Sequence, residues 1–313
     1  MTIAPSAPAS ALPRHRKHTL TQQQSIIGWL FIIPAAVLIA YCAFYPMIMA
    51  LMQSFQTGKG ATLQWPWESG KDWLYNYNRM FKDAKFLQSL KNCFLFLIIQ
   101  VPVMLLLAMW FASMLNRSSL KMKGILRTCI FLPCATSLVS CSVLFRAMFD
   151  TNGIFNLFLV KVGILNTPYQ WLAHTWSARL IIIIVLLWRW TGYNMIFFLA
   201  GLQNLDYSTY EAASLDGATK GQTFWHITVP QLRPIIILTA IMSTNGTLQL
   251  FDEIVNITNG APGYDTLTMS VYIYNLAFRS VPQFGYICAL ANVILLMVAI
   301  LSVIQLKVGD KRD

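Results

Sequence analysis

Long apolar segments constrain the fold of this 313-residue chain more than any other feature. A helix of about 20 residues crosses a hydrocarbon core of about 30 Å. Segments long enough to do so occupy about 26–52, 90–115, 125–149, 177–202, 234–256 and 284–306. Only 11% of the residues are charged, against roughly 25% in soluble domains. Because a backbone in lipid must satisfy its hydrogen bonds internally, these segments predict an all-α integral membrane protein with six transmembrane helices.

The six predicted helices form one transmembrane domain over residues 26–306. Residues 1–25, rich in Pro, Ala, Ser and Gln, predict a disordered arm, and residues 307–313 predict a short tail. The arm ends in the basic run Arg14-His-Arg-Lys17, and basic residues beside a span favour the cytoplasmic side. An even number of spans then places both termini in the cytoplasm. The first apolar segment is too long for the core of a secretory signal, so we interpret it as a signal anchor.

Charge and reactive side chains exclude several function classes. The net charge of +11 is spread over many connections, which argues against nucleic acid and favours contact with anionic lipid headgroups. The sequence contains no GxxxxGK[ST] loop, no HExxH and no GxSxG motif, and no Cys or His spacing suits a metal. We therefore expect no catalytic residue, metal or cofactor in this chain. Any step driven by ATP must use an ATPase on a separate chain.

A polar connection over residues 204–234 separates the fourth and fifth apolar segments. Its pattern predicts two short helices with a break at Asp216-Gly217, the second running from Ala218 to Ile227. Gly217 suits a sharp bend because it has no Cβ and tolerates positive φ. A connection that only joined two spans would not need two helices and a bend. We interpret it as a surface for a partner, with an ordinary amphipathic connector as the alternative.

Polar side chains inside the fourth span are candidates for function, because charged groups in a membrane are costly. Leu186, Arg189, Trp190 and Tyr193 are predicted to share one helix face at i, i+3, i+4 and i+7. Aromatic rings and hydrogen-bonding groups together suit a sugar. Arg189 could instead form an ion pair or extend to the membrane interface, and the sequence leaves these alternatives open.

The fifth span carries a second polar cluster. Ser243, Gly246 and Thr247 share a predicted face with Leu250. Small residues at such a face permit close helix packing, and polar ones near the bilayer midplane also suit a hydrophilic path. Asp252 and Glu253 follow near the outer end, either solvated or paired with a basic group such as Arg189 or Arg279.

The polar connection resembles a known family motif. Glu211-Ala212-Ala213, then Gly217, then Ile227-x-x-Pro230 are similar to the EAA loop of the membrane subunits of bacterial ABC importers. In that family the loop is a coupling helix that sits in a cleft of the cytoplasmic ATPase. The resemblance implies that the residues meeting the ATPase are Glu211, Ala212, Ala213, Asp216, Gly217 and Ala218.

Three further stretches resemble the carbohydrate importers among these permeases: Trp188–Gly201, Thr258-Asn-Gly-Ala-Pro262 and Phe284-Gly-Tyr286. The pattern looks like the first of two permeases of the maltose type. The resemblance implies an inner-membrane permease subunit that forms half of a sugar path. Its implied partners are a second permease, an ATPase dimer and an extracytoplasmic solute-binding protein.

In such permeases the fourth to sixth spans bind sugar midway through the membrane. We therefore predict a substrate lining of Arg189, Trp190, Tyr193, Ser243, Gly246 and Thr247. Tyr193 and Ser243 match the expected residue types, whereas Arg189 replaces an apolar residue. That replacement leaves open an anionic solute such as glycerol phosphate or a uronate sugar. A secondary transporter is less favoured, because we see no clear inverted repeats.

Overall fold

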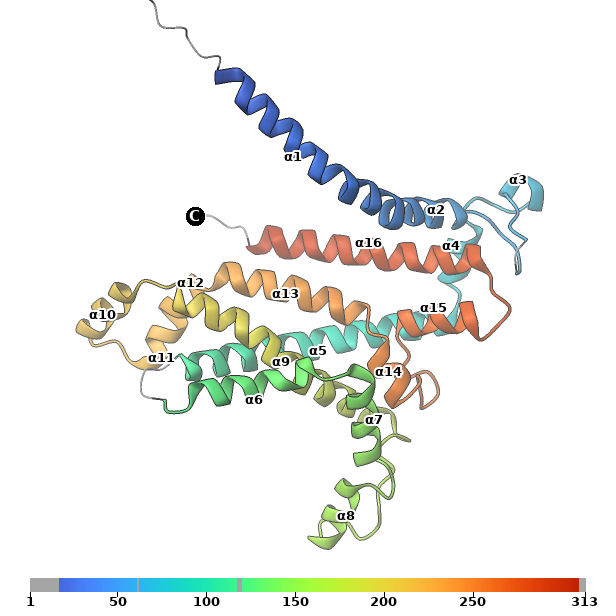
Figure 1. Ribbon diagram of the computed structural model, residues 1–313. Helices are drawn as coiled ribbons and strands as arrows, with labels where there is room; N and C mark the ends of the chain where they lie inside the picture. The colour runs from blue at the N-terminus through green and yellow to red at the C-terminus, as the bar shows by residue number, and fades with distance from the viewer. Residues whose placement is uncertain (1–16, 61, 117–119, 310–313) are drawn as a thin grey trace, which may run out of the picture. The chain divides into compact units, whose positions relative to one another are not determined.

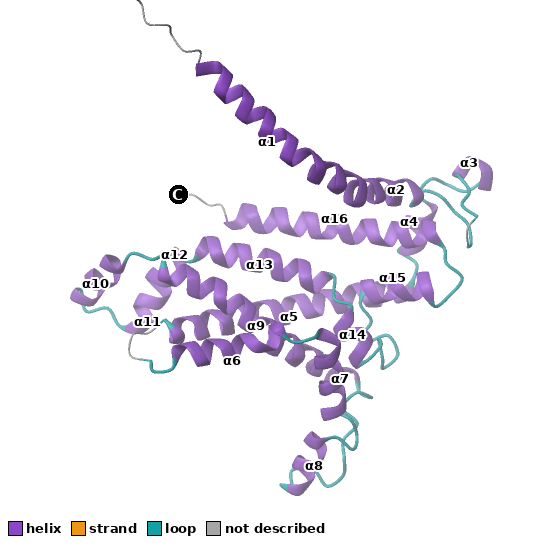
Figure 2. Ribbon diagram, in the orientation of Figure 1, coloured by secondary structure: helices purple, strands orange, loops and turns teal. Residues whose placement is uncertain are grey.

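The computed structural model describes residues 17–60, 62–116 and 120–309 (Figure 1). Helices joined by loops make up this part of the chain (Figure 2), and its one β contact is an isolated bridge between Thr57 and Gln64. The predicted all-α fold is confirmed. The chain divides into two compact units, Met1–Ala50 and Leu51–Asp313, and each is described by itself.

The first unit is built on one apolar helix. Helix α1 (Lys17–Ile39) continues through a π-helical turn, η1 (Ala40–Phe44), into α2 (Tyr45–Gln53). The predicted disordered arm was wrong for residues 17–25, which are helical, while residues 1–16 lie outside the described residues. Once a helix exists, each added residue gains one backbone hydrogen bond, so extending a helix costs less than starting one. The polar residues before the long apolar helix can therefore continue it.

The second unit holds the remaining helices: α3 (Pro66–Ser69), α4 (Tyr75–Met80), α5 (Ala84–Leu115), α6 (Lys123–Ala135), α7 (Leu138–Met148), α8 (Ile154–Lys161), α9 (Thr175–Gln203), α10 (Tyr207–Leu215), α11 (Lys220–Thr223), η2 (Phe224–Thr228), α12 (Val229–Gln231), α13 (Arg233–Leu248), α14 (Asp252–Ile257), α15 (Met269–Phe278) and α16 (Phe284–Gly309). Among these, α9 packs against α5 and α6, α13 packs against α5 and α16, and α14 packs against α7. Buried apolar residues of α5, α9, α15 and α16 form the largest core cluster.

Four helical segments are long and apolar enough to cross a membrane: Ile27–Gln53, Ala84–Leu115, Thr175–Gln203 and Phe284–Gly309. Two further pairs are bent, α6 with α7 by 94° and Gly221–Gln231 with α13 by 69°, and counting each pair as one span gives up to six. The third predicted span thus corresponds to the bent pair α6 and α7, and the fifth falls mainly on α13. Pro133, in the last turn of α6, has no N–H to extend the helix. Helix α13, which lies in the fifth predicted span, ends at Leu248, and α14 is a separate short helix.

A close backbone approach fixes α6 against α9. A Cβ atom on Gly192 of α9 would lie 2.0 Å from the carbonyl oxygen of Ile130 in α6. No side chain fits there without separating the two helices. Gly192 thus permits the close approach of α6 to α9, and its neighbours Trp190 and Tyr193 line the cavity described below.

Gly192→Ala should therefore destabilise the protein by about 1–3 kcal/mol or more, since overpacking forces backbone shifts. We expect lower membrane abundance and a lower Tm in detergent. Gly124→Ala is the matched control, because a Cβ at Gly124 of α6 meets nothing within 4 Å. Equal Tm values for both variants would contradict the close approach of α6 and α9.

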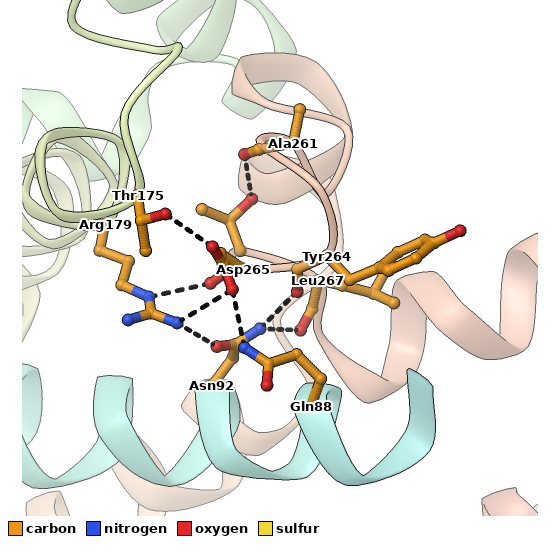
Figure 3. A network of polar contacts seen from close by, with 9 residues as sticks. Gln88, Asn92, Thr175, Arg179, Ala261, Tyr264, Asp265 and Leu267 are labelled. Atoms are coloured by element: carbon orange, nitrogen blue, oxygen red, sulfur yellow. Dashed lines mark hydrogen bonds and ion pairs between the residues drawn. The ribbon is translucent and has the colours of Figure 1, made fainter. Parts of the chain in front are cut away.

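The connection between α14 and α15 is held by a polar network (Figure 3). Asp265 lies at its centre, with Oδ1 3.7 Å from Arg179 Nη2 in an ion pair. The Thr175 hydroxyl donates to Asp265 Oδ2 over 2.6 Å, and Gln88 Nε2 donates to Oδ1 over 2.9 Å. Asn92 Nδ2 donates to the carbonyl of Leu267 over 2.9 Å. The N-terminal parts of α5 and α9 are thereby joined to the connection between α14 and α15.

Candidate functional site

The first arm of the polar connection is helix α10. Asp206 caps its N-terminus, where Oδ1 accepts a hydrogen bond from Ser208 N over 3.0 Å. Hydrogen bonds from the backbone N–H and the hydroxyl of Ser208 lower the pKa of the Asp206 carboxyl. The cap therefore stays ionised at neutral pH, which suits the positive end of a helix dipole.

The predicted bend is at Gly217, whose φ of +73° lies in the left-handed region. Ala218 N donates to Ala213 O over 3.0 Å and Gly217 N donates to Ser214 O over 3.2 Å. This pair of bonds is the Schellman motif, which satisfies the last carbonyls of a helix. The bend is therefore fixed by local hydrogen bonds.

The second arm starts at Lys220, two residues later than predicted, and runs through α11, η2 and α12. Thr219 and Gln222 explain the difference. Thr219 N donates to Gln222 Oε1 over 2.8 Å, and Gln222 N donates to Thr219 Oγ1 over 3.3 Å. This reciprocal capping box makes Thr219 the residue before the helix. The spacing Thr-x-x-Gln is the sequence signal that would have located this start.

The surface of α10 is open. Glu211, Ala212, Asp216 and Gly217 are exposed, and Ala213 and Ala218 are half-buried. Leu215 is 89% exposed, which is unusual for a large apolar side chain. The two arms are tied together by a 3.1 Å hydrogen bond between the hydroxyls of Tyr210 and Thr228. The predicted partner-facing residues thus lie together on a braced, exposed surface.

A cavity of about 360 Å³ lies between α5, α9 and α13, and the segment from Gln249 to Glu253 also lines it. From α9 it is lined by Leu186, Trp190, Tyr193 and Asn194, and from α13 by Met242, Ser243, Gly246 and Thr247. Five of the six predicted lining residues therefore surround one cavity. The Trp190 and Tyr193 rings meet edge to face with centroids 6.0 Å apart.

Close helix packing does not explain the small residue in the α13 cluster. A Cβ on Gly246 would meet nothing within 4 Å. Ser243 is half-buried beside Asn194, whose Oδ1 lies 3.4 Å from the Ser243 hydroxyl. This face of α13 therefore opens onto the cavity.

Arg189 does not line the cavity, which differs from the predicted lining. Its Nη1 donates to Thr136 O over 3.0 Å and to Pro133 O over 3.3 Å, at the break between α6 and α7. It forms no ion pair with Asp252 or Glu253 within 4.0 Å. A helix turns about 100° per residue. Leu186 and Trp190 face the cavity, so Arg189, three residues after Leu186, lies at the edge of their face. The guanidinium instead satisfies carbonyls at the C-terminus of α6.

Polar lining residues that the sequence did not identify come from other elements. Gln100 of α5 is buried, and its Oε1 lies 2.8 Å from the Thr247 hydroxyl. Asp252 and Glu253 also line the cavity, with Glu253 4% exposed. A polar residue inside an apolar span was the available signal for Gln100. For the two carboxylates the signal was lacking, because the sequence does not show that the chain breaks after Leu248.

The described residues contain no group of three or more His, Cys, Asp or Glu side chains arranged to hold a metal ion. Two bent helix pairs, an exposed polar loop and a cavity with several polar side chains among apolar helices are features expected of a membrane subunit of a transport system. The family of binding-protein-dependent transport system inner membrane components matches residues 80–310, and the chain belongs to this family. The resemblance drawn from the sequence is confirmed.

Relatives of the chain include sugar permeases. It is 45% identical over 298 residues to a lactose transport system permease protein from Rhizobium radiobacter, covering 95% of this chain and 98% of that one. It is 31% identical to an arabinooligosaccharides transport system permease protein from Halalkalibacterium halodurans, covering 93% and 90%. A solved bacterial ABC transporter that imports alginate is similar in fold, with a TM-score of 0.80, 19% identity and coverage of 95% and 99%.

Proposed function

We propose that this permease lines the path of a neutral saccharide, which binds in the cavity between α5, α9 and α13. Its volume of about 360 Å³ falls within the usual range of small-molecule sites, about 300–1,000 Å³. Trp190 and Tyr193 offer apolar ring surface to sugar C–H groups. The Ser243 and Thr247 hydroxyls and the Gln100 and Asn194 amides offer hydrogen bonds to sugar hydroxyls. The relative that is 45% identical is a permease of a transport system for lactose, which is a neutral disaccharide.

The charge of the residues that line the cavity favours a neutral solute over an anionic one. Its charged residues are Asp252 and Glu253, and no Lys or Arg contributes to it. An acidic sugar would meet like charge there without a cationic partner, which costs free energy in a partly desolvated site. Arg189, the reason to consider glycerol phosphate or a uronate, is directed to the α6–α7 break instead.

Uptake by the complete transporter tests this proposal. Trp190→Ala should lower uptake of a neutral disaccharide roughly tenfold, because a lost ring contact of about 1.5 kcal/mol corresponds to that factor. Trp188→Ala is the matched control, since Trp188 lies two residues earlier on α9 but does not line the cavity. Lactose and galacturonate uptake are measured at equal membrane abundance. Efficient uptake of galacturonate by the unaltered protein would reject a neutral substrate.

We also infer that residues 204–234 couple this cavity to a cytoplasmic ATPase on a separate chain. The loop joins α9 to α13, the two helices that supply most of the cavity wall. From Tyr193 to Gln203 the helix continues for about 15 Å at about 1.5 Å per residue, so a displaced loop moves the lining directly. A second permease completes the path, and a solute-binding protein delivers sugar from outside. The loop and both termini are then cytoplasmic.

A further inference from the structure

We propose that a second, polar cavity binds the phosphate of an anionic membrane phospholipid. The cavity has a volume of about 330 Å³ and shares no lining residue with the cavity between α5, α9 and α13. Its lining includes three cationic side chains, Lys59, Lys71 and Arg79, and no carboxylate. The remaining lining is polar or aromatic: Thr57, Gly58, Tyr75, Asn76, Gln283 and Tyr286.

The three cations have no carboxylate partner. In the part of the chain that the structure describes, the one ion pair within 4.0 Å joins Arg179 to Asp265. Lys71 Nζ lies 4.4 Å above the Tyr75 ring, and the Arg79 guanidinium lies 4.4 Å above the Tyr286 ring. Asp83, which accepts a 2.7 Å hydrogen bond from the Tyr286 hydroxyl, is not part of the lining. The cavity therefore favours an anion, and Lys and Arg are strong donors to phosphate oxygens.

The wall of this cavity is built by specific contacts. Asn76 is 3% exposed, and its Nδ2 donates to the carbonyls of Ser54 and Gln56, each over 2.8 Å. Gly60 N donates to Pro282 O over 2.8 Å, which joins the connection before α4 to the residues before α16. The cations are thus carried on a fixed scaffold.

The position of the cavity selects a lipid. Arg79 precedes α5 by a few residues, and Gln283 and Tyr286 flank the start of α16, so two spanning helices begin at this level. Helix α4, which carries Arg79, packs against α16 (Figure 1). The other end of α16 lies at the coupling loop, where Arg233 Nη2 donates to Val308 O. A helix of 26 residues spans about 39 Å, so the cavity and the loop lie at opposite membrane surfaces.

Exposed aromatic residues that are close in sequence to Lys71 and Arg79 match a membrane interface. Trp67 is 64% exposed, Trp73 55% and Phe81 67%. The rings of Trp67 and Trp73 have centroids 5.7 Å apart. Trp and Tyr concentrate at the headgroup level of membranes, on both sides. Lys and Arg beside such rings are placed to bind headgroup phosphates. With the loop in the cytoplasm, an orientation that rests on the proposed function, the lipid belongs to the outer leaflet.

Native mass spectrometry of the complete transporter, reconstituted in nanodiscs, tests the proposal. The discs contain phosphatidylcholine with phosphatidylglycerol as the anionic probe. We expect the unaltered protein to retain phosphatidylglycerol preferentially, and the Lys71→Gln, Arg79→Gln double variant to retain about tenfold less. Arg146→Gln with Lys161→Gln is the matched control, because both side chains are exposed and lie outside the cavity. Lys59→Gln, a milder change, should give an intermediate loss if the double variant is unstable.

Three outcomes would overturn the lipid site. The first is equal retention of the two lipids by the unaltered protein. The second is displacement of phosphatidylglycerol by millimolar glycerol phosphate or inorganic phosphate, which would indicate a site for a soluble anion. The third is full lipid retention by the double variant together with weakened binding of the solute-binding protein, which would indicate a docking site for protein carboxylates. Sugar uptake is measured separately, so a failed lipid site leaves the proposed function untouched.

Discussion

Glu211→Ala should abolish most coupled uptake while the protein still inserts in the membrane at normal abundance. The Glu211 carboxylate is exposed on α10, a helix whose ends are fixed by Asp206 and Gly217. If a basic group of the ATPase pairs with the Glu211 carboxylate, the Glu211→Ala substitution leaves that basic group unpaired. Such a loss costs about 2–5 kcal/mol, or roughly 30-fold or more in the affinity of the ATPase.

The measurement is sugar-stimulated ATP hydrolysis by the reconstituted transporter, together with co-purification of the ATPase. Ser214→Ala is the control, because Ser214 is exposed on the same helix and carries no charge. Normal stimulation in the Glu211→Ala variant would show that the carboxylate has no role in coupling. Loss of membrane abundance would instead indicate a structural role.

Arg189→Leu is expected to destabilise the protein rather than change its substrate. Arg189 is 7% exposed, and its guanidinium lies 5.4 Å above the Trp190 ring while donating to Pro133 O and Thr136 O. Hydrogen bonds of a charged donor contribute about 1.5–3 kcal/mol each, so losing both should cost about 3 kcal/mol or more. The break between α6 and α7 would lose the cation that satisfies its carbonyls.

Membrane abundance and uptake, measured together, separate the two roles of Arg189. We expect abundance and Tm to fall, and the sugar preference of the remaining protein to stay unchanged. Arg146→Leu is the control, since Arg146 is exposed at the end of α7. Unchanged abundance with a selective loss of acidic-solute uptake would return Arg189 to the substrate path.

Apolar segments predicted where the membrane helices lie, because span length follows from hydrocarbon thickness alone. The bends between these helices could not be predicted in the same way. Hydropathy depends on composition alone. At the 94° bend between α6 and α7, the carbonyls of Pro133 and Thr136 accept hydrogen bonds from Arg189, which is distant in sequence. The sequence could name that arginine as costly but not say which groups it meets.

The loop was predicted more closely than the cavity for a physical reason. The bend at Gly217 arises from neighbours within a few residues, so the sequence was enough to predict it. The cavity instead needs α5, α9 and α13 to meet, and Gln100 becomes part of it only through tertiary packing. The helical repeat predicts which residues share a face of one helix. It does not predict which residues of different helices come into contact.

Three hydrogen bonds that shape the polar loop over residues 204–234 join residues within the loop itself. Asp206 bonds Ser208, Thr219 bonds Gln222, and Tyr210 bonds Thr228. An ATPase that meets this surface does not have to fold it, so little ordering entropy opposes the association. We therefore expect the arm from Asp206 to Gln222 to be transferable, because Phe224, Val229 and Leu232, which anchor the loop to the membrane helices, follow it. Exchanging it between related permeases should redirect which ATPase assembles with the transporter, while the sugar-binding walls stay as they are.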